Sequence, residues 1–357
     1  MIKKYFGWAI GIALVVYSAM FIDVFLTVGF AAALTVLYQA LSLSAVEVAV
    51  SFDNAAVNAT HLPKMNPFWQ KMFLTVGILI AVIGMRFYLP LQIVSYIGDL
   101  SIVDSYNLAV DDGAAFGKIL ADASATIAGF GGAFLLMTGL AFFVQADKEA
   151  NWISWFEVPL QKLGELTDGI QIKGFMFRPV EAAITLGLAY LISADHGNME
   201  FFNAAIAGLG VFYAVDLLKL CFEALDEKLS TSKAKWIAGG LGTFIYLEVL
   251  DASFSFDGVV AAFALSDNLW VIAGALGVGA AFVRCMTVYL HKTGAMKTYE
   301  YLENGAFVAI LFLAASMYVG ELFHLPHWIV AVTSIASIGA AVYSSVKNET
   351  PEEQKAA

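Results

Sequence analysis

Two stretches of this chain place acidic residues inside apolar sequence: LSLSAVEVAVSFDNAAVNA at residues 41–59 and IYLEVLDASFSFDGVVAAFA at residues 245–264. When their SFD triplets are aligned, Glu47 falls opposite Asp251 and Asp53 falls opposite Asp257, while Glu248 adds a fifth carboxylate. An acidic side chain left unpaired in hydrocarbon costs about 3 kcal/mol or more, so such residues face a protein interior and usually serve an ion pathway. The two stretches therefore predict an internal repeat with a polar centre.

The composition predicts a polytopic membrane protein in contact with the lipid bilayer. Of the 357 residues, 60% are hydrophobic and 14% are charged, and the mean hydropathy is +0.77, whereas soluble domains are about 25% charged. Strand alternation is absent, so an all-α bundle is expected rather than a barrel. The net charge of −11 argues against a nucleic-acid partner. Cys221 and Cys285 have no metal-ligand spacing.

Apolar windows predict about ten membrane helices. They cover residues 6–28, 31–60, 69–90, 124–145, 179–194, 201–222, 235–265, 269–290, 304–322 and 327–346. The chain then divides into a first helix (1–30), a first repeat with helices 2–4 (31–145), an interfacial linker (146–178), helices 5 and 6 (179–234), a second repeat with helices 7–9 (235–322), and a last helix with its tail (323–357). The N-terminal apolar run is too long for a signal peptide and is expected to be retained.

The distribution of Lys and Arg predicts the orientation. When Lys3 and Lys4 are placed in the cytoplasm, Lys118 is the one loop lysine that falls in an outer loop. Both termini are therefore expected in the cytoplasm, an acidic loop at 91–123 is expected outside, and the compartment is expected to be a bacterial plasma membrane. The linker has Trp and Leu on one helical stripe and charges opposite, as in a helix that lies in the membrane interface.

The repeat extends beyond the SFD triplets. A helix that opens at Trp69 contains Arg86, and one that opens at Trp270 contains Arg284. GGAFLLM at 131–137 then resembles NGAFVAI at 304–310. Helices 2–4 thus recur as helices 7–9, and an odd displacement of five helices makes the copies inverted. Inverted repeats are typical of secondary transporters, which bind their substrates where the repeats meet.

Oxygen ligands dominate both stretches, which favours Mn²⁺, Mg²⁺ or Ca²⁺ over Zn²⁺ or Cu²⁺. The candidate metal ligands are Glu47, Asp53, Asn54, Glu248, Asp251 and Asp257. Candidate charge-pairing or pathway residues are Ser51, Arg86, Asp216 and Arg284. Charges left over after one divalent ion binds could take up protons or a counter-ion. The alternative is a buried network in which the acids pair with the two arginines and only fix the helix register.

Helical geometry sets a condition on this site. At about 100° per residue, Asp257 points about 180° away from Glu248, and Asp53 points about 120° away from Glu47. One ion could collect these groups only if each helix unwinds at its SFD triplet, with the help of Asn54 or Gly258. We therefore expect two discontinuous helices whose freed carbonyls act as extra ligands.

These motifs resemble the TerC family of integral membrane proteins, named for tellurium resistance. Its first signature is similar to Glu-x-x-x-Ser-x-Asp-Asn, which reads Glu47, Ser51, Asp53 and Asn54 here. The second is similar to Glu-x-x-Asp-x-x-Phe-x-x-Asp-Ser and is matched by Glu248, Asp251, Phe254 and Asp257, with Gly258 in place of the Ser. The resemblance covers both repeats and points to a longer branch of the family. It implies manganese export in several bacterial members, some of which help to load secreted enzymes with metal.

The leading hypothesis is a transporter without a resident cofactor that exports a divalent cation, most simply Mn²⁺, by alternating access. A metal-delivery factor for secreted metalloenzymes and an indirectly acting tellurite-resistance protein are the alternatives. An intramembrane aspartyl protease would also use two acids in the membrane. It is disfavoured because the chain has five acids in repeated motifs and lacks a Tyr-Asp or Gly-x-Gly-Asp pairing. The sequence leaves the oligomeric state open.

Overall fold

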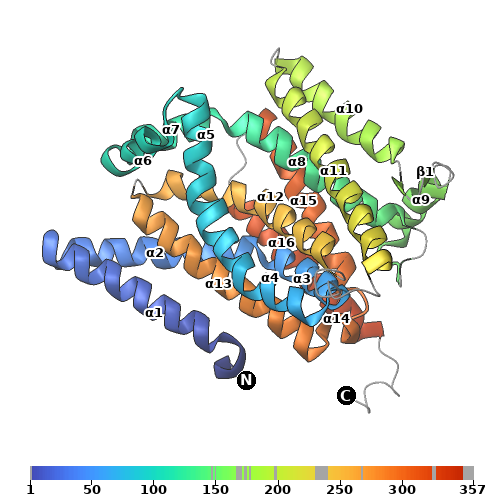
Figure 1. The fold of residues 1–357 in the computed structure, drawn as a ribbon, viewed down its shortest axis with the longest axis horizontal. Coiled ribbons are helices and arrows are strands. Elements are labelled where there is room, and N and C mark those ends of the chain that lie inside the picture. Colours follow the sequence, from blue (N-terminus) through green and yellow to red (C-terminus); the bar gives the residue numbers. More distant parts are fainter. Residues whose placement is uncertain are drawn as a thin grey trace.

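A computed structural model describes residues 2–145, 148, 150–165, 171–172, 175–176, 178–196, 199–229, 240–266, 268–323 and 327–348. Its regular structure is helical except for a two-residue ladder between β1 (Gln171–Ile172) and β2 (Phe175–Met176). The helices are α1 (Ile2–Thr27), α2 (Phe30–Val50), α3 (Phe52–His61), η1 (Leu62–Lys64), α4 (Pro67–Leu79), η2 (Ile80–Tyr88), α5 (Leu89–Ile97), α6 (Ile102–Asp111), α7 (Gly113–Asp122), α8 (Ser124–Val144), α9 (Ser154–Glu165), α10 (Pro179–His196), α11 (Glu200–Leu229), α12 (Leu241–Leu265), α13 (Leu269–Thr293), α14 (Ala295–Thr298), α15 (Leu302–Leu322) and α16 (His327–Asn348). The predicted all-α polytopic bundle is confirmed (Figure 1).

Within the described residues, eight stretches are long and apolar enough to cross a membrane. They are Lys4–Thr27, Phe30–Val50, Pro67–Ile97, Ser124–Val144, Glu200–Phe222, Leu269–Thr293, Leu302–Leu322 and Ile329–Asn348. The sequence predicts about ten such helices. The remaining two, α10 and α12, form at the predicted positions but fall outside these eight. The length of α12 would suffice, but it carries three acidic residues.

The two predicted repeats pack with exchanged partners. The first copy consists of α2 with α3, then α4, η2 and α5, then α8, and the second consists of α12, α13 and α15. The first helix of each copy packs on the second helix of the other, because α2 and α3 contact α13 while α12 contacts η2 and α4. The third helices, α8 and α15, contact each other. In Figure 1, α2 runs from the left edge toward the centre, whereas α12 runs from the centre toward the left, as inverted copies require.

Matching N-caps open the second helix of each copy. The Asn66 side chain accepts a hydrogen bond from Trp69 N at 3.0 Å. The Asn268 side chain accepts from Trp270 N at 2.9 Å and from Val271 N at 3.1 Å. Each Asn satisfies backbone donors that have no partner inside the helix, so the repeat preserves the start of the helix as well as its apolar face.

The segment predicted as an acidic outer loop, 91–123, folds mostly into helices. Ser101 caps α6 by accepting a hydrogen bond from Asp104 N, and Asp112 caps α7 by accepting from Ala115 N. The ring of Phe116 in α7 lies 4.9 Å from that of Phe263 in α12. Some of the acids therefore act as helix caps and local hydrogen-bond partners, and α7 covers one end of α12.

The interfacial linker contains α9, which is fixed to the bundle by a buried acid. Glu157 is 0% exposed, forms an ion pair with Lys148 and accepts hydrogen bonds from the backbone of Trp152 and Ile153. Asn304 of α15 donates to its carboxylate at 3.2 Å. Trp155, in contrast, is 82% exposed. The linker is thus attached to α15 through a polar contact, while Trp155 extends away from the protein.

Candidate functional site

Glu47 and Arg86 form a buried ion pair within the first repeat. Their side chains are 2% and 1% exposed, and Arg86 Nε also donates to Glu47 Oε1 at 3.2 Å. Ser51 donates to the same carboxylate oxygen at 3.2 Å, and Arg86 Nη1 donates to the Ala81 carbonyl at 2.8 Å. A buried charge pair is stable only when further hydrogen bonds satisfy its members, and the bonds with Ser51 and with the Ala81 carbonyl do so here.

The helix that carries Arg86 is wound as a π-helix over Ile80–Tyr88. Pro90 explains part of this winding, because proline has no N–H and its ring would clash with the carbonyl four residues earlier, that of Arg86. Leu89 N instead donates to the Gly84 carbonyl, five residues back. Wide turns of this kind occur often at functional sites. The sequence-based end of this helix at residue 90 is wrong, since helical structure continues to Ile97.

Arg284 is the buried arginine of the second repeat and contacts two acids. Its Nη2 atom lies 3.5 Å from Glu248 Oε1 and 3.5 Å from Asp251 Oδ2. The guanidinium also lies over the Phe73 ring, 3.8 Å from its centroid. Cation–π contact stabilises a desolvated cation by about 2 kcal/mol. Each repeat therefore has one buried arginine beside its own acids.

Asn54 joins the two repeats. Its side-chain amide donates to Asp251 Oδ1 across the interface, and its oxygen accepts from Asn58 at 2.9 Å. All three side chains are at most 4% exposed. Because Asn54 and Asp251 come from different copies, this hydrogen bond depends on how the copies pack.

Asp53 is a fully buried acid with no described ion pair. It is 0% exposed, and its Oδ1 atom accepts a hydrogen bond from Asn54 N at 2.9 Å. Its Oδ2 atom has no hydrogen-bond donor among the described residues, and no ion pair joins it to a described cation. One hydrogen bond offsets only part of the cost of desolvating a carboxylate, so a proton or a cation would stabilise Asp53 further.

Two glycines provide room for these acids. A Cβ atom at Gly77 would collide with Glu248 Oε1, and a Cβ atom at Gly279 would lie 2.5 Å from Glu47 Cγ. The helices can therefore approach the carboxylates closely only because both positions lack a side chain. The sequence repeats glycines at corresponding places in the second helix of each copy, but their contacts could not be deduced from spacing alone.

The predicted unwinding of both helices is only partly confirmed. The first copy has a break at Ser51 between α2 and α3 (φ −93°, ψ 16°), although Ser51 N still donates to the Glu47 carbonyl and Ala55 N to the Ser51 carbonyl. The second copy has no break, because α12 runs continuously through Gly258. The expectation of a discontinuous second helix is therefore wrong.

The predicted ligands form one ion pair and one chain of contacts rather than one ring. Asn54 meets Asp251, Arg284 meets Glu248 and Asp251, and Glu47 is held by Arg86. Among the described residues, no group of three or more His, Cys, Asp or Glu side chains is close enough to hold a metal ion. The prediction that the acids converge on one pocket in this conformation is therefore not met by the side chains that are described.

For two predicted residues, no contact with this cluster is described. The side chain of Asp257 lies outside the described residues, although its backbone belongs to α12. Asp216 is half-buried in α11, which contributes none of the described contacts of Glu47, Asp53, Glu248 and Asp251 given above. Phe73, by contrast, belongs to the site but could not be recognised from sequence, because a buried aromatic residue in an apolar helix is ordinary.

Comparisons with known proteins agree with this architecture. The uncharacterized membrane protein YceF of Bacillus subtilis (strain 168) is 32% identical over 162 residues, a match that covers 42% of this chain and 61% of the relative. The chain therefore spans less than two thirds of that relative's length. No solved structure matches. Residues 52–352, which include both repeats from α3 onward, match the family described as "Protein of unknown function (DUF475)". The chain is an integral membrane protein of the DUF475 family.

Proposed function

We propose that this protein is a transporter that exports a divalent cation, most simply Mn²⁺, from the cytoplasm by alternating access. The observation that carries the proposal is Asp53, a fully buried carboxylate with one oxygen that has no described donor. It lies next to Asn54, which bonds to the opposite repeat. Buried acids at a repeat interface are typical of ion sites in transporters.

Charge balance supports a doubly charged substrate. Four described acids are buried in this region (Glu47, Asp53, Glu248 and Asp251), together with two arginines. Four negative charges and two positive charges leave two negative charges when every group is ionised. A single divalent cation would neutralise that excess, and the carboxylate and amide oxygens suit Mn²⁺, Mg²⁺ or Ca²⁺.

The contacts of Arg284 support a mechanism in which a metal ion replaces the arginine beside the acids. Its contacts of 3.5 Å with Glu248 and Asp251 are long for charge-assisted hydrogen bonds, which are typically about 2.7–2.9 Å. We propose that the arginine stabilises these acids in the absence of substrate and withdraws when the ion joins Asp251, Asn54 and Asp53. A rocking motion of one repeat against the other would alternate access, and a proton or another cation would return on the released acids.

The membrane orientation of the chain and its resemblance to the TerC family also belong to this proposal. The positions of Lys and Arg support an orientation with both termini in the cytoplasm, and the proposed compartment is a bacterial plasma membrane. The two TerC-like motifs contribute the residues described above, which supports a shared metal chemistry. Proteins that deliver metal to secreted enzymes, or that confer tellurite resistance indirectly, would use the same residues but would require cellular partners.

Transport in vesicles tests the proposal. The purified full-length protein would be reconstituted without partners, and entry of Mn²⁺, Mg²⁺ and Ca²⁺ would be followed with a trapped metal-sensitive dye. We expect Asp53→Asn to lower the rate on the order of 10-fold or more, which corresponds to about 1.4 kcal/mol. Asp23→Asn is the matched control, because Asp23 is exposed near the end of α1. Full transport by Asp53→Asn would contradict the assignment, and metal sensitivity in cells without transport in vesicles would favour a delivery factor.

A further inference from the structure

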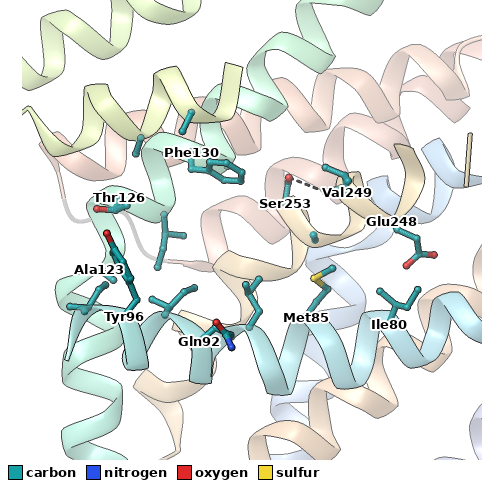
Figure 2. Close-up of a pocket in the computed structure, with 18 of the residues that line it drawn as sticks. Ile80, Met85, Gln92, Tyr96, Ala123, Thr126, Phe130, Glu248, Val249 and Ser253 are labelled. Carbon is teal, nitrogen blue, oxygen red and sulfur yellow. Dashed lines mark hydrogen bonds between the residues drawn. The ribbon is translucent and has the colours of Figure 1, made fainter. Parts of the chain in front are cut away.

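A cleft of about 910 Å³ runs along one side of the bundle. Its walls come from η2 and α5, the N-terminal parts of α8 and α11, and α12. It follows the helix from Ile80 to Ile97, which at 1.5 Å per residue is roughly 25 Å. Figure 2 shows Glu248 beside Ile80 at one end and Tyr96, Ala123 and Thr126 at the other. The cleft therefore joins the buried acids to the end of the bundle that the Lys and Arg distribution places outside.

The charged residues that line the cleft all have the same sign. They are Glu248 at the inner end and Asp122 and Glu200 at the outer end, and none of the described lining residues is Lys, Arg or His. Gln92, Thr126 and Ser253 add amide and hydroxyl groups along its length. Acidic walls in a low-dielectric cleft raise the local concentration of cations and repel anions.

Glu248 links the cleft to the candidate site. Its side chain is 8% exposed, and neither carboxylate oxygen has a hydrogen-bond donor among the described residues. Its described charge partner is Arg284, which also contacts Asp251. The Glu248 carboxylate therefore lines the cleft and shares Arg284 with Asp251, the acid that bonds to Asn54.

The size of the cleft and its acidic lining residues suit a hydrated cation in transit. A volume of about 910 Å³ leaves room for a cation with its first shell of water. Apolar side chains predominate between the polar ones, so an ion would not be held tightly along the way, as conduction requires. An alkyl chain from the bilayer would fill the same space if the cleft were dry, and the experiment below separates the two occupants.

We propose that this cleft is the outer access path for the divalent cation, with Glu248 as the residue that passes the ion between the cleft and the acids beside Arg284. This inference rests on the proposed function. It adds the route, the residues that line it and the side of the membrane to which it opens.

Accessibility of single cysteines tests the path. In a Cys221→Ser, Cys285→Ala background, Ser253→Cys and Thr126→Cys would be exposed to membrane-impermeant cationic and anionic methanethiosulfonates in right-side-out and inverted vesicles. Val103→Cys, which is 66% exposed in α6, serves as the accessible control, and Leu14→Cys, 64% exposed on apolar α1, serves as the lipid-facing control. We expect both cleft cysteines to react from the outer face, about 10-fold faster with the cationic reagent, and Mn²⁺ to slow the reaction at Ser253→Cys.

The outcomes separate this inference from the proposed function. Cleft cysteines as unreactive as Leu14→Cys would show a cleft filled by apolar chains, and would overturn the path even if vesicles transport Mn²⁺. Reaction only from the inner face, or reaction unaffected by Mn²⁺ in vesicles that transport it, would overturn it as well. Outer-face reaction that Mn²⁺ slows, in vesicles that transport no metal, would support a cation path while removing the exporter assignment.

Discussion

At the scale of single residues, two buried arginines compensate the charge of the buried acids beside them. Arg86 and Arg284 are among the largest fully buried side chains, and each lies beside acids of its own repeat. Pairing does not remove the desolvation cost of these charges, but removal of one partner leaves the other charge uncompensated. Asp53 differs because the described structure gives it no such partner.

Replacement of Arg86 tests this pairing. We expect Arg86→Gln to lower the free energy of unfolding by about 3–5 kcal/mol, because Glu47 would remain buried without its cation. Thermal unfolding in detergent would show this as a lower Tm. Adding Glu47→Gln to Arg86→Gln should restore much of the loss, since two neutral amides can bond to each other. A double variant that is less stable than Arg86→Gln would contradict the pairing.

At the scale of helices, close packing depends on positions that lack a side chain. A Cβ atom added to Gly279 of α13 would lie 2.7 Å from Glu47 Cβ and 3.3 Å from the Ser44 carbonyl oxygen. Ser44 itself donates to the Ala275 carbonyl at 2.7 Å. Small residues allow helix backbones to approach within a membrane. The contact between α2 and α13 therefore sets the position of Glu47.

Adding one methyl group should separate these helices. We expect Gly279→Ala to destabilise the protein by about 1–3 kcal/mol, as overpacking of a dense core does, and to lower transport by displacing Glu47. Gly187→Ala in α10 is the matched control, because nothing lies within 4 Å of its added Cβ. That control should be neutral or stabilising by up to about 1 kcal/mol. Equal Tm values for the two variants would rule out the close contact.

The attachment of α9 gives a second prediction at this scale. Glu157 satisfies two backbone donors at the start of α9 and bonds to Asn304 of α15. We expect Glu157→Ala to loosen α9 and to increase cleavage of the linker in limited proteolysis, while Glu165→Ala, at an exposed position of the same helix, leaves it unchanged. Unaltered cleavage in Glu157→Ala would show that apolar contacts alone hold α9.

At the scale of the whole molecule, the hydrogen bond between Asn54 and Asp251 joins the inverted copies at their centre. The exchange of helix partners between the copies brings these two residues together from positions 197 apart in sequence. A motion of one copy against the other would have to preserve or break this bond. Variants of these two residues therefore test directly whether the two copies pack against each other as described.

Exchanging the two residues tests that relation. Asn54→Asp should destabilise the protein because it places two carboxylates face to face. Adding Asp251→Asn should recover stability, since an amide and a carboxylate again oppose each other, with a coupling free energy of about 0.5–3 kcal/mol. Thermal unfolding of the single and double variants measures this coupling. Additive losses would mean that the two side chains do not interact.

Some features of the fold and the site were predictable from the sequence, and others were not. The apolar windows located the long helices, and the aligned SFD triplets identified Glu47 and Asp251 as equivalent positions near a common interface. Spacing alone could not show that Pro90 accompanies a π-helical turn before it, or that α12 stays continuous at Gly258. Both depend on hydrogen bonds and packing that only the folded chain defines.

The sequence by itself determined that this is a membrane bundle with a repeated acidic centre. A bilayer requires apolar helices whose backbone groups form hydrogen bonds with each other, and the composition and the spacing of apolar residues show such helices. Only the tertiary structure decided which acid meets which partner: Glu47 meets Arg86, Asp251 meets Asn54, and Asp53 has an oxygen without a described donor. Side-chain pairing falls off within a few ångströms, so it depends on how residues distant in the chain are packed, which no local pattern records.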